Sequence, residues 1–334
     1  ILIIGSVTID EIEGKIKCGG PATYCSLASW LIGWKPYVVG TMGSDFQWFF
    51  PFEATFVKLN KTIRFKHTYL EDGTRFSEIL YHPENKISAK VNVKDFDAVI
   101  INPVFDEFDH EWLEYIVKEH NFTGIDLQGF VREKGENNRI KVKKPDQETV
   151  EKILNKALIV KASDEEVLDE NARYGKIFIL TLGRRGAITH WEGQKIYVPT
   201  IPVDVEPSGA GDIFLATFLT CLIVGNDVKY CTIKANAVTS YVLEHRLLTL
   251  TEKCVEQEKI GDMFNILEKA KEDILGDKEL SKKIKFFWYD LRQQLFGNYD
   301  DVIDFLFPIE YELESKNKKR CIKIDTKVIS ISQE

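Results

Sequence analysis

The stretch EPSGAGDIFLATFLTCL, residues 206–222, places small residues directly before an acid that opens a long apolar run. Gly209, Ala210 and Gly211 have almost no side chains, so their backbone N–H groups can point at one spot without obstruction. The N-terminus of the helix expected to follow adds partial positive charge at the same place. This turn therefore favours a bound phosphate oxygen, or the charge that develops on a phosphoryl group in transfer.

Asp212 lies within the same turn, and a carboxylate beside an anion site is a poor ligand for phosphate. The role that fits it is to accept the proton of a hydroxyl that attacks phosphorus. The alternative is structural, with Ser208 as the cap and Asp212 as the first-turn acid of an ordinary helix. Taken alone, the motif leaves both interpretations open.

Two other segments favour the chemical interpretation. ILTLGRRGA, residues 179–187, is a strand that runs into a glycine turn, and ligands of open α/β sheets bind at the carboxyl ends of strands. Asp10 and the pair Gly19–Gly20 offer a carboxylate and a close backbone approach, which suit a polyhydroxylated substrate. The segment 62–81 alternates apolar and polar residues across an Asp-Gly turn, which predicts a hairpin that would cover the site and exclude water.

The elements that must position these residues alternate between strands and helices. Short apolar runs at 1–7, 36–43, 97–104, 122–129, 156–163 and 176–183 read as strands. Helices are expected at 22–31, 211–224 and 228–244, where the last two close the core. Repeated strand–helix alternation predicts a doubly wound parallel sheet covered by helices.

With these motifs in place, residues 1–250 resemble the ribokinase family of sugar and nucleoside kinases, also called PfkB carbohydrate kinases. EPSGAGDIFLATF matches the family's carboxyl-terminal signature, and GGPATYCSLASWLIGWKPYVVGTMGSD matches its amino-terminal signature more loosely. The resemblance implies a three-layer α/β/α sandwich with a small β lid, the hairpin at about 62–82. It also implies Mg2+-dependent transfer of the ATP γ-phosphoryl group to a hydroxyl of a small polyol or sugar.

The resemblance also implies roles for individual residues. Asp212 matches the catalytic base, and Gly209, Ala210 and Gly211 match the anion hole. ASDEEV is similar to the family's Asn-x-x-Glu element, with Glu166 acting on Mg2+ through its water shell. The residues implied to bind the nucleotide and its metal are Ser163, Glu166, Thr181, Gly183 and Gly186. Those implied to contact the hydroxyls of the substrate are Asp10, Gly19 and Gly20.

Two positions depart from the family pattern. Tyr24 stands near the place where many members have Asn, which argues against simple ribose or fructose specificity. Glu206 replaces the usual Asp at the start of the second signature, which argues against a monovalent-cation site. These departures leave open a binding or regulatory protein that keeps the fold without turnover.

IDLQGFVR and INPVFDEF, residues 125–132 and 101–108, are similar to the inositol-kinase branch of the family. We therefore expect a cyclic polyol such as myo-inositol, with Tyr24, Gln128 and Arg132 at the substrate. A polar strand end and a surface arginine explain Gln128 and Arg132 equally well. A nucleoside kinase of the same family is the alternative.

Composition narrows the class of partner and the compartment. The 334 residues carry a net charge of −8 with 44% hydrophobic content, so no general attraction to nucleic acid or to an anionic membrane is expected. No apolar run reaches the roughly 18–20 residues that span a bilayer. ILIIGSVTIDE lacks a basic leader, and the cysteines are scattered without a C-x-x-C pair. We expect free thiols and a cytoplasmic protein.

The residues from 251 to 334 are expected to form an α+β extension of unknown role. Residues 257–295 have helical spacing, and PIEYELESKNKKRCIKIDTKVISIS suggests two strands joined by a basic turn. The apolar stripe from Leu280 to Leu295 either packs on the core or forms the interface of a homodimer, and the sequence leaves both open.

Three further side chains are ambiguous. His67 and His82 flank the hairpin and could reach the site, although residues on a wet hairpin are more often plain surface. Lys161 could lie near phosphates, although a lysine that ends a strand is usually solvated. No Walker lysine motif, zinc-ligand spacing or G-x-G-x-x-G after the first strand is present, which argues against a P-loop kinase, a structural zinc and a dinucleotide-binding oxidoreductase.

Overall fold

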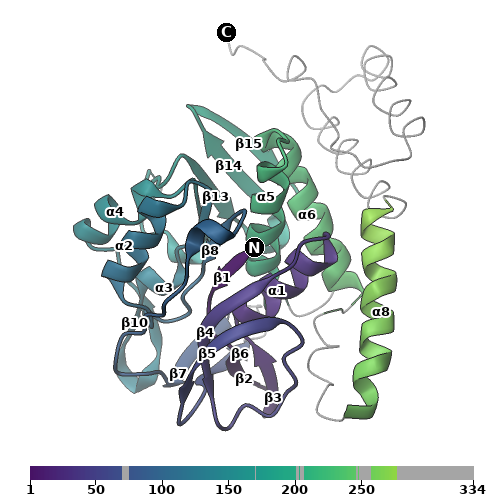
Figure 1. Cartoon of the computed structure of the whole chain (residues 1–334). Coiled ribbons are helices and arrows are strands. Elements are labelled where there is room, and N and C mark those ends of the chain that lie inside the picture. The colour runs from purple at the N-terminus through teal and green to yellow at the C-terminus, as the bar shows by residue number, and fades with distance from the viewer. Residues whose placement is uncertain are drawn as a thin grey trace.

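The fold is taken from a computed structural model of the chain, which describes residues 1–69, 75–169, 171–200, 203, 207–245, 247 and 257–276. A nine-stranded sheet runs through the molecule in the order β15-β14-β13-β12-β9-β8-β1-β4-β5 (Figure 1). Its strands are β1 (Leu2–Ile4), β4 (Tyr37–Gly43), β5 (Glu53–Leu59), β8 (Val99–Ile101), β9 (Thr123–Asp126), β12 (Ile159–Ser163), β13 (Ile177–Thr181), β14 (Ala187–Trp191) and β15 (Gln194–Val198). The seven strands from β13 to β5 are parallel, and β14 and β15 complete the sheet in antiparallel pairing. The expected parallel sheet is confirmed, with β5 and the antiparallel edge as additions.

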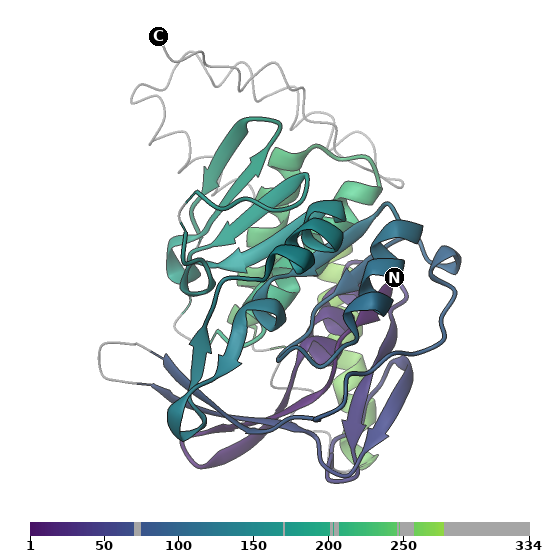
Figure 2. The same ribbon diagram turned by 90° about the vertical axis from the view of Figure 1, so that its left-hand side faces the viewer.

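Helices cover both faces of this sheet (Figure 2). The helices of one face are α1 (Pro21–Leu31), α5 (Ala210–Ile223) and α6 (Val228–Glu244), and those of the other are α2 (His110–Glu119), α3 (Gln128–Val131) and α4 (Gln147–Lys152). Successive residues of a strand point to opposite faces, so Ile3 packs with α1 and α5 while Leu2 and Ile4 pack with α2 and α3. The near-continuous apolar strands follow from burial on both faces, and the three-layer α/β/α sandwich expected from the sequence is confirmed.

Helix α8 (Gln257–Leu275) lies along α1 at the edge of the sandwich (Figure 1). Leu267, Ala270 and Ile274 are buried and belong to the same apolar cluster as α1 and α5. Lys271 Nζ lies 4.2 Å from the centre of the Trp30 ring. Helix α8 therefore completes the cover of this face. The predicted stripe from Leu280 to Leu295 and the strands expected beyond residue 308 lie outside the described residues.

The lid is larger than the predicted hairpin. The sequence hairpin is present as β6 (Ile63–Tyr69) and β7 (Arg75–Tyr81), but β2 (Thr8–Ile12) and β3 (Lys15–Gly19) extend it to a four-stranded sheet in the order β3-β2-β6-β7. Asp10 lies beyond β1, inside β2, where it stands opposite Lys17 and Phe65. The parallel pairing of β2 with β6 joins segments more than 50 residues apart, and local sequence carries no signal for it.

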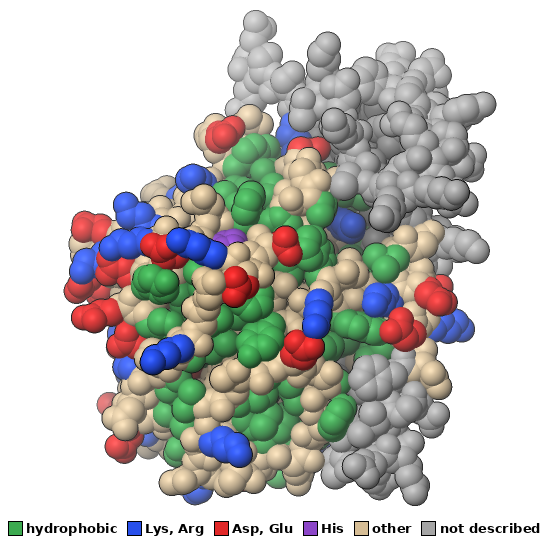
Figure 3. All heavy atoms as spheres, in the orientation of Figure 1, with side chains coloured by type: hydrophobic (Ala, Val, Ile, Leu, Met, Phe, Trp, Pro, Cys, Tyr) green, Lys and Arg blue, Asp and Glu red, His purple; other side chains and the backbone are tan. Residues whose placement is uncertain are grey.

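Ile63, Phe65 and Ile79 of the lid pack with Val104 and Phe105, which follow β8. This small cluster holds the lid against the carboxyl ends of the main strands. A further two-stranded ribbon joins β10 (Arg132–Lys134) to β11 (Ile140–Val142). Among the described residues, no helix is both long and apolar enough to cross a membrane. Acidic and basic side chains are interspersed on the face shown in Figure 3.

Candidate active site

A pocket of about 340 Å³ opens between the lid and the N-terminus of α5. Every predicted site residue except Gly19 lines it. These residues are Asp10, Gly20, Tyr24, Gln128, Arg132, Ser163, Glu166, Thr181, Gly183, Gly186, Gly209, Ala210, Gly211 and Asp212. Gly19 lies behind Asp10, because a Cβ at Gly19 would stand 2.2 Å from Asp10 Oδ2. Residues spread over 200 positions of sequence thus meet in one cavity of the size that small ligands occupy.

The glycine turn before α5 has no room for side chains. Gly209 adopts a left-handed conformation with φ of 80°, and a Cβ there would stand 2.5 Å from the Tyr24 ring. A Cβ at Gly211 would stand 2.5 Å from Lys161 Nζ. Ala210 N–H donates to Pro207 O at 3.0 Å, whereas the N–H groups of Gly211 and Asp212 have no hydrogen-bond partner in the described part of the chain. These two donors and the helix end suit an anion.

Asp212 is buried in the first turn of α5, with 8% of its surface exposed. Asn102 Nδ2 donates to Asp212 Oδ1 at 2.6 Å. Burial, with a smaller contribution from Asp126, raises the pKa of Asp212 to about 7, although Lys161 and Asn102 oppose the shift. A carboxyl group with a pKa near neutrality is suited to accept a proton at physiological pH.

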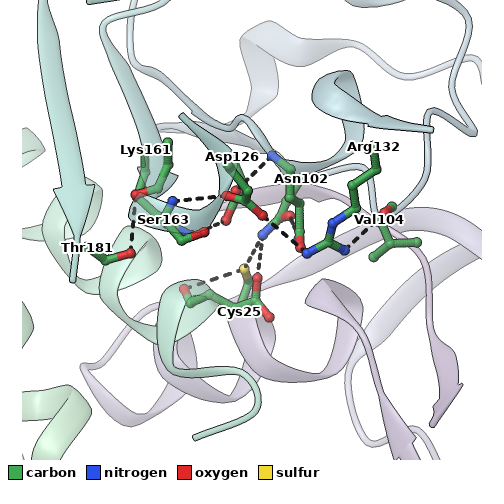
Figure 4. Close-up of polar contacts among 12 residues, drawn as sticks. Cys25, Asn102, Val104, Asp126, Arg132, Lys161, Ser163 and Thr181 are labelled. Carbon is green, nitrogen blue, oxygen red and sulfur yellow. Dashed lines mark hydrogen bonds and ion pairs between the residues drawn. The ribbon is translucent and has the colours of Figure 1, made fainter. Parts of the chain in front are cut away.

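Lys161 and Asp126 form a buried ion pair with Nζ and Oδ2 2.6 Å apart (Figure 4). They stand directly opposite each other on β12 and β9, on the face of the sheet that α5 covers. Burial acts to lower the pKa of Lys161, but Asp126, Glu166 and Asp212 outweigh it and raise that pKa, so the ammonium stays charged. The expectation that a strand-end lysine is solvated is wrong here, since Lys161 lies inside the sheet with its charge against the glycine turn.

Glu166 is held from two sides. Its Oε2 accepts from Ser163 N at 2.9 Å in a capping box, and its Oε1 accepts from Arg132 Nη2 at 3.2 Å. Arg132 also donates to Val104 O at 3.2 Å (Figure 4). Burial acts to raise the pKa of Glu166, but Arg132 and Lys161 outweigh it and lower that pKa. Arg132 is therefore a half-buried link in the pocket wall and not a plain surface residue.

The strand-end turn after β13 forms another wall of the pocket. Thr181 Oγ1 donates to Ala162 O at 3.2 Å, which fixes its position beside β12. Gly183 and Gly186 have φ of 56° and 107°, and a Cβ at Gly186 would stand 2.1 Å from Val198 O. The turn requires glycine at both positions, which leaves exposed backbone at the carboxyl end of a strand.

The lid contributes a further carboxylate, Asp10, to the pocket. Thr8 Oγ1 donates to Asp10 Oδ1 at 2.9 Å, and His67 Nε2 lies 4.0 Å from the same oxygen. His67 Nδ1 lies 2.8 Å from Ser77 Oγ, and its ring stacks on Phe65. His67 lines the pocket, whereas His82 packs on Phe105 outside it. The sequence therefore indicated that a histidine of the lid could reach the pocket, but it did not indicate which of the two does so.

Sequence reasoning missed Asn102 and Asp126. Both directly follow or end apolar strands, and a polar residue at the carboxyl end of a buried strand was the signal that could have found them. Cys25 was also missed, and its buried thiol lies 3.6 Å from Asp212 O. Cys18, Cys25, Cys221 and Cys231 are free thiols, as expected from the sequence.

Mg2+ was expected to reach the site through the water shell beside Glu166. The described residues contain no cluster of three or more acidic, histidine or cysteine side chains that could hold a metal. Both oxygens of Glu166 already accept hydrogen bonds.

Residues 132–253 match the family model of the pfkB family carbohydrate kinase. An inositol 3-kinase of Zea mays is 41% identical over 78 residues, which cover 22% of this chain and 21% of that protein. A nucleoside kinase of Methanocaldococcus jannaschii is 34% identical over 68 residues, which cover 20% of this chain and 22% of that protein. The matched segments thus span about a fifth of these relatives' own length.

Solved structures match over most of the chain. Two structures of pyrophosphate-dependent kinases in the ribokinase family, one complexed with a pyrophosphate analog and myo-inositol, have TM-scores of 0.62 and 0.59 at 22% identity. Each match covers 78% of this chain and 99% of the other. Arabidopsis thaliana ribokinase complexed with ribose and ATP has a TM-score of 0.53 at 16% identity, over 73% of this chain and 92% of the other. Residues 132–253 are therefore similar to the pfkB family of carbohydrate kinases, and the described part of the chain has the ribokinase-like fold.

Proposed function

We propose that this protein transfers a phosphoryl group from ATP to a hydroxyl of a small polyol or sugar, with a cyclic polyol such as myo-inositol as the favoured acceptor. The observation that carries the proposal is a single pocket that joins a buried carboxyl of pKa about 7, Asp212, to the glycine turn Gly209–Gly211. Asp10 and Gly20 line the same pocket from the lid side. A base, an anion site and a hydroxyl-binding carboxylate are the groups that this reaction needs.

In the proposed reaction, the acceptor hydroxyl lies between the lid and Asp212. Its oxygen attacks the γ-phosphorus, its proton passes to Asp212, and the bond from phosphorus to the departing diphosphate oxygen breaks. The N–H groups at the start of α5 and the ammonium of Lys161 stabilise the charge on the phosphoryl oxygens. Glu166 is the residue that would face the water shell of a bound Mg2+, and the ion would supply positive charge against the donor phosphates.

The lining of the pocket beside α6 favours a nucleotide as the donor. Val203 and Leu243 line it together with Thr200, Asn236 and Thr239. Pyrophosphate has no group that would contact these side chains, whereas the base and ribose of ATP would bury against them. Because the fold resembles that of pyrophosphate-dependent kinases, pyrophosphate is tested as a donor beside ATP.

Two similarities support the cyclic polyol. The chain resembles an inositol 3-kinase over 78 residues, and one solved structure of the same fold contains myo-inositol. The Tyr24 ring lies against Gly209, and Asp10, Gln128 and Arg132 line the same pocket with polar groups that would bind a ring of hydroxyls. The nucleoside kinase relative favours the second candidate, a nucleoside acceptor.

A panel of acceptors and donors tests the proposal on the full chain. Product phosphate esters would be followed by 31P NMR with myo-inositol, other polyols, ribose, fructose, adenosine and inosine, each with MgATP or pyrophosphate. Asp212→Asn serves as the blank for contaminating kinases. Turnover with a cyclic polyol supports the proposal, and turnover with nucleosides alone supports the second candidate. Ligand binding by calorimetry without turnover of any acceptor would instead identify a binding protein.

A further inference from the structure

Two side-chain amides connect the pocket wall to Asp212. Asn102 directly follows β8 and is fully buried. Its Nδ2 donates to Asp212 Oδ1 at 2.6 Å, and its Oδ1 accepts from Gln128 Nε2 at 2.7 Å. Asn102, Gln128 and Asp212 thus form a continuous chain of hydrogen bonds from α3 to α5.

The direction of this chain follows from the chemistry of its end. An ionised carboxylate only accepts hydrogen bonds, so Asn102 must turn its NH2 group toward Asp212. The carbonyl of Asn102 then faces Gln128, which must donate its own NH2 group in turn. If Gln128 were replaced by an apolar residue, no other described residue would donate to the Asn102 carbonyl and hold the amide in this direction.

Asn102 itself has little freedom to move. Its backbone N–H donates to Ile4 O at 2.8 Å, which ties it to the end of β1. Its Nδ2 also lies 3.6 Å from Cys25 Sγ of α1 (Figure 4). The amide is therefore clamped between the strands of the sheet and α1, and it holds Oδ1 of Asp212. Oδ2 of Asp212 has no hydrogen-bond partner among the residues that the structure describes.

The charged groups around Asp212 come from several elements. Asp126 on β9 disfavours a second negative charge, while Lys161 on β12 and Arg132 on β10 favour it. The thiol of Cys25 on α1 is buried, and burial raises its pKa well above the ordinary value, so it stays neutral. Asn102 is the neutral donor in this set, and it acts on Asp212 by contact.

We propose that Asn102 is a positioning residue for Asp212, and that Gln128 sets the direction of the Asn102 amide so that Asp212 presents its second oxygen to the acceptor hydroxyl. This inference rests on the proposed function for its role in turnover. Gln128 then acts through Asn102, in addition to any contact with substrate predicted from the sequence.

The test compares Asn102→Leu and Gln128→Met with the unchanged enzyme across pH. Loss of a hydrogen bond to a charged carboxylate raises the pKa of that group by about one unit or more. We expect Asn102→Leu to move the acidic limb of kcat/KM upward by about one unit. Activity would then fall about fivefold at pH 7 and recover substantially at pH 9. Gln128→Met should move the same limb in the same direction by a smaller amount.

A matched control removes a different buried carboxamide. Asn226 donates to Cys221 O at 2.9 Å near the end of α5 and does not line the pocket. Asn226→Leu should lower the melting temperature without moving the pH limb. If Asn102→Leu only lowers the melting temperature in the same way, Asn102 is structural and the proposal is overturned.

A second readout does not depend on turnover. The carboxyl of Asp212 can be followed by 13C NMR in protein labelled at aspartate, with the signal assigned by its loss in Asp212→Asn. An upward shift of that titration in Asn102→Leu, or in Gln128→Met should the first variant fail to fold, supports the proposal. An unchanged titration in the folded variants overturns it. Absence of turnover in the unchanged protein would reject the proposed function alone.

Discussion

The floor of the pocket and its lid differ in how their charged side chains are held. On the floor, Asp126, Lys161 and Asp212 are buried, and each makes a hydrogen bond of 2.6 Å. Asp126 and Lys161 lie on strands β9 and β12 of the main sheet, and Asp212 lies on helix α5, which covers one face of that sheet. On the lid, Asp10 accepts from Thr8, two residues before it on the same strand, at 2.9 Å, and His67 Nε2 lies 4.0 Å from the same oxygen.

This difference separates two tasks within one cavity. The floor groups bond to partners on other elements of the main body, which holds them in the fixed geometry that a proton transfer and an anion site need. Asp10 and His67 lie on a small sheet whose apolar contacts to the main body are few. We therefore expect changes on the floor to alter turnover and changes on the lid to alter acceptor affinity.

The largest effect is expected from Asp212→Asn. The amide cannot accept the proton, so kcat should fall at least about 100-fold while KM for donor and acceptor stays nearly unchanged. Initial-rate kinetics with both substrates measure this. Asp109→Asn, which exchanges the N-cap of α2 for an equally good cap, is the matched control and should keep full activity. A near-normal kcat in Asp212→Asn would show that Asp212 is not the catalytic base.

The next effect concerns the buried ion pair. Lys161→Met leaves Asp126 buried without its cation, which should lower the free energy of unfolding by about 3 kcal/mol and raise KM for the donor. Lys161→Met combined with Asp126→Leu should recover most of the stability, because an apolar pair of this kind often replaces a buried ion pair at little cost. Urea unfolding measures the free energy of unfolding, and initial-rate kinetics measure KM for the donor. If the double variant also recovered turnover, the pair would have no part in the reaction.

Asp212 also predicts a pH dependence of stability. Its pKa in the folded state, about 7, lies above its ordinary value of 3.8, so the folded state holds the proton longer than the unfolded state. The contribution of this group is therefore most favourable below pH 4 and is lost as pH rises toward 7. Between pH 5 and 8, unchanged protein should lose ~2 kcal/mol relative to Asp212→Asn. If the difference in free energy of unfolding between the unchanged protein and Asp212→Asn were the same at pH 5 and at pH 8, the raised pKa would be contradicted.

The smallest effect is expected on the lid. Asp10→Asn keeps the shape of the side chain and removes its charge, so KM for the acceptor should rise about tenfold, while KM for the donor stays the same. Glu11→Gln is the matched control, since Glu11 is next to Asp10 on β2 and does not line the pocket. A fall in kcat as large as that of Asp212→Asn would erase the distinction between floor and lid.

Local sequence was sufficient to predict the layers and one half of the pocket. Apolar runs of seven or eight residues predicted β1, β4, β8, β9, β12 and β13, since strands buried on both faces need near-continuous hydrophobic character. The small residues from Gly209 to Gly211 predicted the anion turn, because a left-handed residue and two close contacts exclude larger side chains. These features depend on neighbours in the chain, so the sequence determined them.

Tertiary structure alone decided which side chains meet. Asp126 and Lys161 pair because the register of β9 against β12 sets them opposite each other, and register is a property of two strands that pack together. Asn102 reaches Asp212 across 110 positions of sequence, and β2 joins β6 to complete the lid. Charges and amides of this kind take their pKa and their hydrogen-bond direction from burial and from partners, which no local pattern records.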